Sequence, residues 1–396
     1  MRRLLRVAGL ILFNLGLTVV LVELALRVAP LPAGFSSYLK VVGMLEEQQA
    51  AYVKDPRTGI TALRPGQTLT WSIMDGKWTI TTVPFPDDPE LGFRDDGLNP
   101  QARRKAFACG DSYTFGFGVD DAQVWHEQLE RRYQGEVDIF NLRDLGNSVA
   151  DIRDLYPLYK NRFAHDTVLL CIYLGNEFLD CQINAAKKLA SPGAPPPNPV
   201  ASPRPRDLQG NLVVYLKSHS YAVRLAKYLT FRYWAQVGYY NLDTRREVYQ
   251  PEGSPFVFTI DYEENYLVRT CEKDYSPEME QGVAAFDAAL KELVQQVRQD
   301  GKQLCAFVFP FKEQVYWEQW SHRLKDPERY DPFKPNHIVN QALEAQGITY
   351  YDLTEDLIAA GRSEVLYWPI DSHWNPVGNE VAAELIHNWL SRHDFP

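Results

Sequence analysis

From about residue 105 onward, short apolar runs alternate with segments in which apolar positions recur at helical spacing. The apolar runs, which we interpret as buried strands, are 105–109, 137–142, 168–174, 304–309 and 348–352. The amphipathic segments predict helices around 125–133, 150–162, 279–299, 335–345 and 376–392. Strands that alternate with helices are typical of a parallel sheet covered by helices. The pattern therefore predicts an α/β fold with about five parallel strands.

Two segments depart from this alternation. Between residues 30 and 105 there is no strong helical period, but polar and apolar residues alternate on both sides of Asp75-Gly76, which predicts a β-hairpin with a two-residue turn. Residues 184–275 predict an irregular or helical insertion, because prolines near its start exclude the interior of a helix or sheet there. Within it, the aromatic stretch 219–240 predicts one or two helices that cover the main domain.

The N-terminus carries a hydrophobic segment. Three arginines lie within residues 1–6, and residues 7–26 are mostly apolar, interrupted by Asn14 and Glu23. About 20 such residues span a bilayer, and the preceding arginines place the N-terminus in the cytoplasm. We expect this segment to be a single-pass anchor in a bacterial inner membrane, with the rest of the chain in the periplasm or extracellular. Secretion after signal cleavage is the alternative. Glu23 is expected to pair with Arg27.

Composition narrows the possible functions. The chain has 396 residues, a formal net charge of −10 and 13% aromatic residues, which is typical of a globular protein. Because nucleic-acid binding needs clustered Lys and Arg, the acidic balance argues against nucleic acid as a partner. The five cysteines include no C-x-x-C pair, which excludes a zinc ribbon. Cys109, Cys171 and Cys305 are expected to be buried thiols, whereas Cys181 and Cys271 are candidates for a disulfide.

The sharpest chemical motif is G-D-S at residues 110–112. An apolar strand ends at Gly110, so Ser112 is expected on a tight turn at the carboxyl edge of the sheet, where open α/β folds bind ligands. Gly116 and Gly118 would let the following loop pass close to a substrate. A serine after a strand can also simply cap the next helix, so the motif alone leaves both interpretations open.

A second motif supplies the partners that a nucleophilic serine requires. Asp371 and His373 stand two residues apart, just before a predicted helix that starts with Pro376. An imidazole activates a serine best when a carboxylate fixes its tautomer and stabilises the imidazolium. A surface loop or a pair of metal ligands are the alternatives, but no further histidine cluster with ligand spacing accompanies the pair. We predict a triad of Ser112, His373 and Asp371, with no metal and no cofactor.

Two more loops follow predicted strands at the same edge of the sheet. Gly146 lies in L-G-N-S after the second strand, and Asn176 lies in Y-L-G-N-E after the third. Acyl transfer passes through a tetrahedral oxyanion that requires preorganised donors. Glycine and asparagine are ordinary turn residues as well. Because both loops are expected at the same edge of the sheet, the Gly146 N–H and the Asn176 amide are candidates for an oxyanion hole.

The ordered motifs G-D-S, Gly, G-N and D-x-H resemble the SGNH (GDSL-like) hydrolase superfamily over roughly residues 105–392. The resemblance implies a flavodoxin-like three-layer sandwich. It implies that Ser112 is the nucleophile, that His373 is the base and that Asp371 orients the base. The backbone N–H of Ser112 would join Gly146 and Asn176 in the oxyanion hole.

Two features depart from the family pattern. The third block in many members is G-x-N-D, whereas here Gly175 directly precedes Asn176 and Glu177 follows. The acid and base are separated by one residue rather than the more frequent two, a variant associated with membrane-anchored bacterial members. Both departures keep every catalytic group and leave the substrate open.

The hydrophobic segment, the hairpin pattern and the extent of the resemblance together predict three parts of the chain. Residues 1–30 are the anchor or signal, residues 31–104 are an extension with the hairpin, and residues 105–396 are the catalytic domain with its insertion. The acidic pairs Asp95-Asp96 and Asp120-Asp121 are interpreted as solvated loop residues rather than calcium ligands.

The main functional hypothesis is a serine esterase that acts outside the cytoplasm on an acyl ester, including acetylated carbohydrate. The first alternative is an O-acyltransferase that passes an acetyl group to an extracellular or cell-wall polysaccharide. The second is a catalytically inactive glycan-binding or assembly protein, and a lipase for long acyl chains is a fourth candidate. The sequence does not separate water from a sugar hydroxyl as the acceptor.

Overall fold

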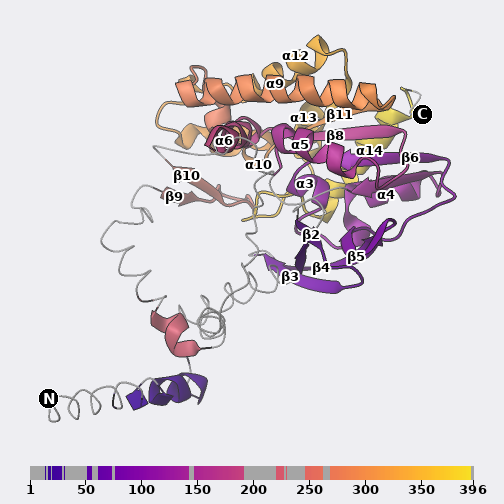
Figure 1. Cartoon of the computed structure of the whole chain (residues 1–396). Helices are drawn as coiled ribbons and strands as arrows, with labels where there is room; N and C mark the ends of the chain where they lie inside the picture. Colours follow the sequence, from indigo (N-terminus) through magenta and orange to yellow (C-terminus); the bar gives the residue numbers. More distant parts are fainter. Residues whose placement is uncertain are drawn as a thin grey trace. The chain divides into compact units, whose positions relative to one another are not determined.

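The computed structural model divides the chain into two compact units. One comprises residues 1–50 and 200–244, and the other comprises residues 51–199 and 245–396. The described residues are 14, 17, 18, 20–28, 31, 51–55, 61–73, 76–141, 147–190, 220–226, 229, 246–261 and 268–393. The second unit contains the β-sheets described below (Figure 1).

A five-stranded parallel sheet forms the core of the second unit, in the order β12-β11-β8-β6-β7. Its strands are β6 (Arg104–Cys109), β7 (Val137–Asn141), β8 (Thr167–Tyr173), β11 (Gln303–Phe309) and β12 (Thr349–Asp352). The predicted α/β class and the five parallel strands are confirmed. Every residue of β8 is buried, as expected for a strand covered on both faces. Along the chain the succession of strands changes direction at the β6–β8 pair, where doubly wound folds bind ligands.

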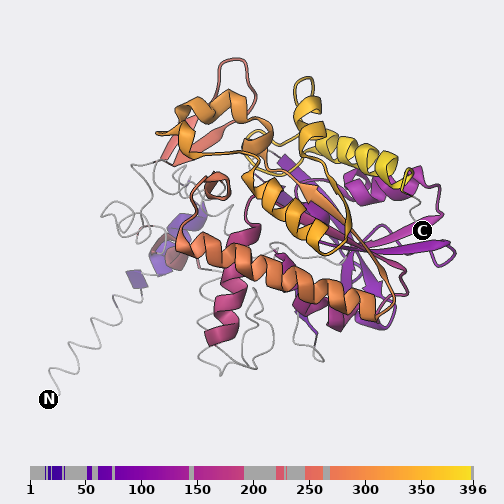
Figure 2. The same cartoon turned by 90° about the horizontal axis from the view of Figure 1, so that it is seen from above.

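The helices form two packed groups. In one, α5 (Val149–Tyr159) and α6 (Glu177–Ala190) contact the long helix α9 (Pro277–Gln299). In the other, α4 (Trp125–Arg132) contacts α14 (Pro376–Leu390). Because crossovers between parallel strands are right-handed, the change of direction places the two groups on opposite faces of the sheet. Figure 2 shows the orange α9 crossing the magenta α6.

The predicted insertion contains regular secondary structure at both of its ends. Helix α6 runs through Asn184 to Ala190, past the expected start of the insertion. Near the end of the insertion, β9 (Arg246–Tyr249) and β10 (Phe258–Asp261) form an antiparallel pair. Phe256 and Phe258 are buried in the same core as the parallel sheet. Of the helices predicted at 219–240, only a turn of helix at 221–226 and residue 229 belong to the described part.

The extension before the parallel sheet folds as a second sheet, antiparallel and five-stranded, in the order β1-β2-β5-β4-β3. Its strands are β1 (Tyr52–Lys54), β2 (Thr61–Leu63), β3 (Thr68–Ile73), β4 (Gly76–Phe85) and β5 (Asp88–Arg94). The predicted hairpin is the β3–β4 pair, in which Trp71 faces Trp78. Both tryptophans are buried in a cluster that also contains Phe115, so this sheet packs on the short helix that begins at Ser112.

The N-terminal hydrophobic segment is described only in part. Glu23 accepts a hydrogen bond from Arg27 at 2.9 Å, as predicted, and it also accepts one from the Ala222 N–H at 2.9 Å. No helix among the described residues is long and apolar enough to cross a membrane. Residues 1–13 of the predicted anchor lie outside the described residues.

The two cysteines considered for a disulfide are both buried thiols. Cys181 Sγ donates to Glu177 Oε1 at 3.1 Å, and Cys271 Sγ points to the Pro332 carbonyl at 3.9 Å. They therefore do not pair with each other.

Candidate active site

The G-D-S motif forms a tight turn between β6 and the short helix α3 (Ser112–Phe115). Asp111 is the N-cap of this helix, and its side chain accepts a hydrogen bond from the Tyr113 N–H. Gly110 leaves no room for a side chain, because a Cβ there would lie 2.0 Å from Thr114 Oγ1. Ser112 therefore follows β6 closely, at the carboxyl edge of the sheet.

Asp371 and His373 lie in the loop before α14. The cap of that helix is Asn375, which accepts a hydrogen bond from the Gly378 N–H, and Pro376 occupies the first turn. His373 Nε2 lies 2.7 Å from Ser112 Oγ, and His373 Nδ1 lies 2.5 Å from Asp371 Oδ1. The structure thus joins the three predicted triad residues in one chain of hydrogen bonds.

Electrostatics favour the charge distribution that a triad requires. Burial works to raise the pKa of Asp371, but hydrogen bonds from His373 and the positive charges of His373 and Lys312 outweigh it and hold that pKa below its usual value. An ionised Asp371 accepts the Nδ1 proton of His373, which leaves Nε2 free to accept the proton of Ser112. The side chains of His373 and Asp371 are 21% and 20% exposed, so a ligand can reach this end of the sheet.

Aromatic rings hold the imidazole in place. The ring of Phe117 lies 4.7 Å from that of His373, and the ring of Tyr113 lies 5.1 Å from it, measured between centroids. The Tyr113 hydroxyl donates to the carbonyl of Ser372, the residue between the acid and the base. The helix that starts with Ser112 therefore also fixes the loop that supplies the base.

A buried lysine holds the backbone of the same loop. Lys312 is 1% exposed and begins α10 (Lys312–Val315), just after β11. Its Nζ donates to the carbonyls of Val257, Pro369 and Ile370 at 3.2 Å each and to that of Asp371 at 3.4 Å. We did not predict this residue. Its one sequence signal is its place in F-P-F-K-E-Q-V-Y, which overlaps the end of a predicted strand.

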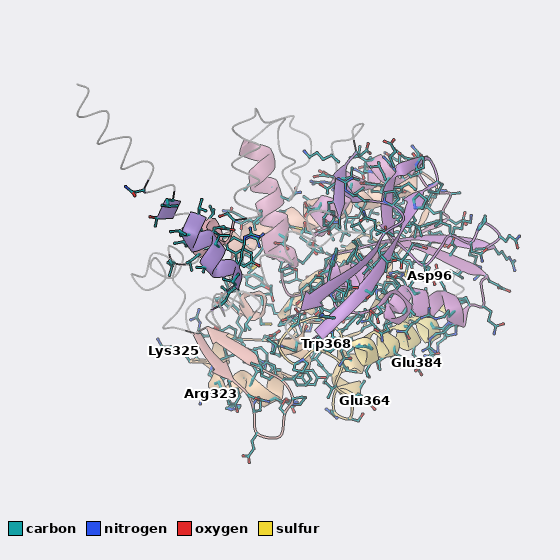
Figure 3. The ribbon with its side chains drawn as sticks, turned by 90° about the horizontal axis from the view of Figure 1, so that it is seen from below. Asp96, Arg323, Lys325, Glu364, Trp368 and Glu384 are labelled. Carbon is teal, nitrogen blue, oxygen red and sulfur yellow. The ribbon has the colours of Figure 1, made fainter. Side chains whose placement is uncertain are left out.

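Replacing Lys312 with methionine is expected to lower kcat by about 10²-fold with little change in KM, because the acid and base lose their alignment. Steady-state kinetics with an acetyl ester would measure both constants, and thermal unfolding would report the folded fraction. The control is Lys325→Met, since Lys325 is exposed at the surface (Figure 3). An unchanged kcat per folded molecule in Lys312→Met would contradict the positioning role.

The predicted oxyanion hole is described only in part. Asn176 lies between β8 and α6, and Ser112 follows β6, the strand that pairs with β8. The two residues therefore occupy the same edge of the sheet. Gly146 lies outside the described residues.

Glu177, next to Asn176, supports the segment that follows Gly146. It is 4% exposed, and its Oε1 accepts hydrogen bonds from the Val149 N–H at 2.8 Å and from Cys181 at 3.1 Å. Burial raises the pKa of Glu177 to about 8, although both hydrogen bonds oppose the shift. The carboxyl group thus ties the start of α5 to the start of α6.

This raised pKa predicts a pH-dependent stability. A carboxyl whose folded pKa is raised contributes stability that is full below its usual pKa of 4.5 and is lost as the pH rises through about 8. Glu177→Gln keeps the acceptor oxygen and carries no charge, so it should unfold at a higher temperature than wild type at about pH 9 and at nearly the same temperature at about pH 4.5. Thermal unfolding at both pH values tests this, with the exposed Glu384→Gln as control. An equal difference at both values would contradict it.

Arg94, the last residue of β5, clamps the loop after Ser112. Its guanidinium donates to the carbonyls of Phe115 at 2.8 Å, Gly116 at 2.6 Å and Val119 at 2.6 Å. Gly116 has a φ of 77°, a conformation that favours glycine. The sequence did not indicate this role. The antiparallel sheet is therefore part of the framework of the site.

Asp120 is exposed, as expected, but the pair Asp120-Asp121 also makes specific hydrogen bonds. Asp120 Oδ1 accepts the Thr79 N–H and Asp121 Oδ2 accepts the Thr81 N–H, both at 2.6 Å. Asp121 also accepts a hydrogen bond from Arg94 Nε at 2.7 Å. The pair anchors strand β4 to the loop after the nucleophile.

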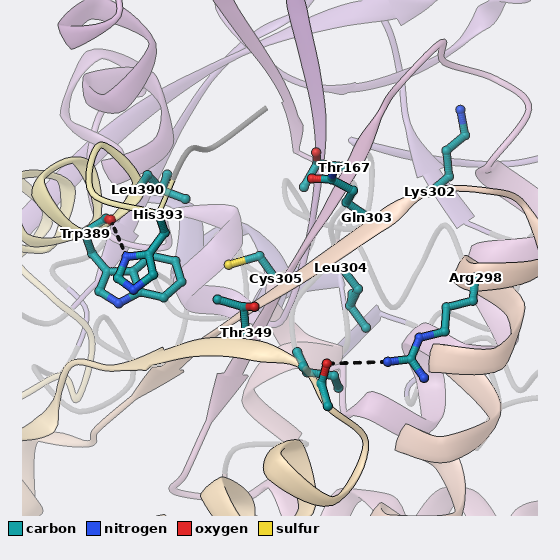
Figure 4. A pocket seen from close by; sticks show the side chains of 12 residues that line it. Thr167, Arg298, Lys302, Gln303, Leu304, Cys305, Thr349, Trp389, Leu390 and His393 are labelled. Carbon is teal, nitrogen blue, oxygen red and sulfur yellow. Dashed lines mark hydrogen bonds between the residues drawn. The ribbon is translucent and has the colours of Figure 1, made fainter.

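A separate pocket lies at the opposite edge of the parallel sheet (Figure 4). Its volume is about 420 Å³, and its walls include Thr167, Gln303 and Thr349, the first residues of β8, β11 and β12. Arg298 and Lys302 line it, but both donate to backbone carbonyls. Because Ser112 lies at the carboxyl ends of the strands, this pocket is not part of the triad site.

One family model matches part of the chain. Residues 263–395 match the family model described as the SGNH hydrolase-like domain of acetyltransferase AlgX. The matched stretch contains Asp371 and His373, whereas Ser112 lies outside it. Together with the five-stranded parallel sheet, the match is consistent with an SGNH hydrolase-like domain. No curated protein matches the chain.

Three of the similar solved structures are described as acetyl xylan esterases or as a lipolytic protein. The acetyl xylan esterase AlAXEase has 12% identity, a TM-score of 0.37, and coverage of 72% of this chain and 98% of that chain. A putative lipolytic protein of the G-D-S-L family from Desulfitobacterium hafniense has 10% identity, a TM-score of 0.37 and coverage of 72% and 98%. The acetylxylan esterase Axe2 from Geobacillus stearothermophilus has 14% identity, a TM-score of 0.37 and coverage of 73% and 94%.

Proposed function

We propose that the protein is an O-acetyltransferase that forms an acetyl-enzyme at Ser112 and passes the acetyl group to a carbohydrate hydroxyl outside the cytoplasm. The observation that carries the proposal is the hydrogen-bonded chain from Asp371 through His373 to Ser112. The description of the matched family model, an acetyltransferase, supports transfer over the hydrolysis that we first inferred from sequence.

The first half-reaction acetylates Ser112. As Ser112 Oγ attacks the carbonyl carbon of an acetyl ester, its proton passes to His373 Nε2, and the carbonyl oxygen becomes an oxyanion. Collapse of this intermediate breaks the bond to the leaving alcohol, which takes the proton from His373. Asp371 stabilises the imidazolium throughout. We assign the oxyanion to the backbone N–H of Ser112 with Gly146 and Asn176.

The second half-reaction returns the enzyme to its starting state. A carbohydrate hydroxyl gives its proton to His373 Nε2 and attacks the acetyl carbonyl, and the proton then returns to Ser112 Oγ as the acetyl group leaves. Water in place of the sugar would make the same site an esterase. This is the second candidate, and the same triad geometry favours it.

The test is a partition experiment on the full chain. The enzyme is given p-nitrophenyl acetate with or without acetyl-free oligosaccharides, and free acetate and acetylated oligosaccharide are measured by mass spectrometry. Transfer predicts acetylated oligosaccharide in excess of free acetate, and both products should be absent in Ser112→Ala. Rapid release of acetate that no oligosaccharide diverts would establish the esterase instead.

A further inference from the structure

Three carboxylates converge on the side of the parallel sheet that α4 covers. Asp95 and Asp96 directly follow β5, and Glu127 lies in the first turn of α4. One oxygen from each carboxylate lies within 4.8 Å of the others. Asp95 is 3% exposed and Glu127 is 2% exposed, whereas Asp96 is exposed. The burial of Asp95 corrects our expectation that the Asp95-Asp96 pair is solvated.

Glu127 has an oxygen that the protein leaves unsatisfied. Its Oε2 is shielded from solvent and has no hydrogen-bond partner among the described residues. Its Oε1 lies 3.6 Å from His126 Nδ1, which exceeds a hydrogen-bond distance. A buried carboxylate oxygen without a donor or cation is strongly unfavourable, so this atom indicates a missing positive partner.

Nearby charged groups do not supply that partner. Arg94 directs its guanidinium to three backbone carbonyls and Asp121. Among the described residues, the cluster's other charged neighbours are acids: Glu130 accepts the Ile139 N–H, and Asp138 accepts the Asn99 N–H at 3.2 Å. Such a cluster binds protons or a cation.

We propose that Asp95, Asp96 and Glu127 bind one calcium ion. The ligand atoms are all carboxylate oxygens, which hard divalent cations prefer. Oxygens about 2.3–2.6 Å from a calcium ion can lie up to about 5 Å apart, which accommodates the separations in this cluster. Magnesium demands near-ideal octahedral geometry and gives up its waters reluctantly, so a set of three protein carboxylates favours calcium. The exposed Asp96 provides access, and water completes the coordination.

The ion would stabilise the framework of the triad site. It bridges the end of β5 to α4, and Asp95 is adjacent to Arg94, which clamps the loop after Ser112. Binding would fix the position of Arg94 through its neighbour. This role is structural and is independent of the acceptor in the proposed reaction.

Calcium binding is measured on the full chain after EDTA treatment and removal of the chelator. Equilibrium dialysis should retain one calcium per chain, and millimolar calcium should raise the unfolding temperature by roughly 2 to 5 °C. Magnesium at the same concentration should raise it much less. No retained calcium, or an equal effect of magnesium, would overturn the proposal.

Substitutions in the cluster test whether Asp95, Asp96 and Glu127 bind the calcium ion. Glu127→Gln and Asp96→Asn should lose the response to calcium, and Glu127→Gln should be at least as stable as wild type in EDTA because one of three repelling carboxylates is gone. The control is Glu384→Gln, an exposed acid on α14 (Figure 3), which should respond as wild type does. Retained calcium binding in both cluster variants would refute the assignment.

Discussion

Replacing Ser112 with alanine is expected to abolish acetyl transfer and ester cleavage together. The single oxygen removed is the atom that lies 2.7 Å from His373 Nε2 and that would carry the acetyl group. Without it, only the oxyanion donors and substrate binding remain, so the rate should fall by about 10⁵- to 10⁶-fold. The burst of p-nitrophenol and the acetylated peptide that contains Ser112 should both disappear.

The fold should survive this change, because the side chain is small and only partly buried. The unfolding temperature is therefore expected to stay near that of wild type. Ser363→Ala, which removes an exposed serine hydroxyl, serves as the matched control and should keep full activity. Ester cleavage by the Ser112→Ala protein at more than a few per cent of the wild-type rate would exclude Ser112 as the nucleophile. An inactive wild type, in contrast, would favour the glycan-binding alternative.

The parallel sheet could be predicted because its strands are continuous apolar runs that alternate with amphipathic helices. Strand β8, buried at every residue, is the clearest of these. Most of the antiparallel sheet could not be predicted. Strand β5 starts with the partly buried Asp88 and the exposed Pro89 and Glu90 and ends with buried residues, so neither an alternating nor a continuous apolar pattern marks it. Its place is set by pairing with β4 and β2.

The triad motifs could be identified because each stands in a short segment with a recognisable local structure. Lys312 and Arg94 carry no such signal. Their partners are mostly backbone carbonyls, which every residue possesses, and those of Lys312 lie 55 to 59 residues away in the sequence. The burial of Asp95 could not be predicted for a related reason. Whether a pair of acidic residues in a loop is solvated or buried depends on the tertiary structure that packs against it.

Asp371→Asn is expected to lower kcat by about 10³- to 10⁴-fold while Ser112 and His373 remain in place. The substitution keeps an oxygen to accept the His373 backbone N–H, which Asp371 Oδ1 does at 2.9 Å. It removes the negative charge that stabilises the imidazolium in both half-reactions. If the new amide group turns toward Nδ1, it also forces the proton onto Nε2, where it blocks transfer from Ser112.

The pH dependence of kcat distinguishes a role of Asp371 in the triad from a merely structural role. Because the pKa of Asp371 lies below its usual value, the carboxylate keeps its charge, and its contribution to stability, until the pH falls below the usual range for aspartate. Loss of that charge in Asp371→Asn should therefore reduce kcat at every pH at which wild type is active. The exposed Asp287→Asn on α9 is the control. If Asp371→Asn keeps the wild-type kcat at neutral pH, Asp371 is not the acid of the triad, and its short contact with His373 only holds the loop.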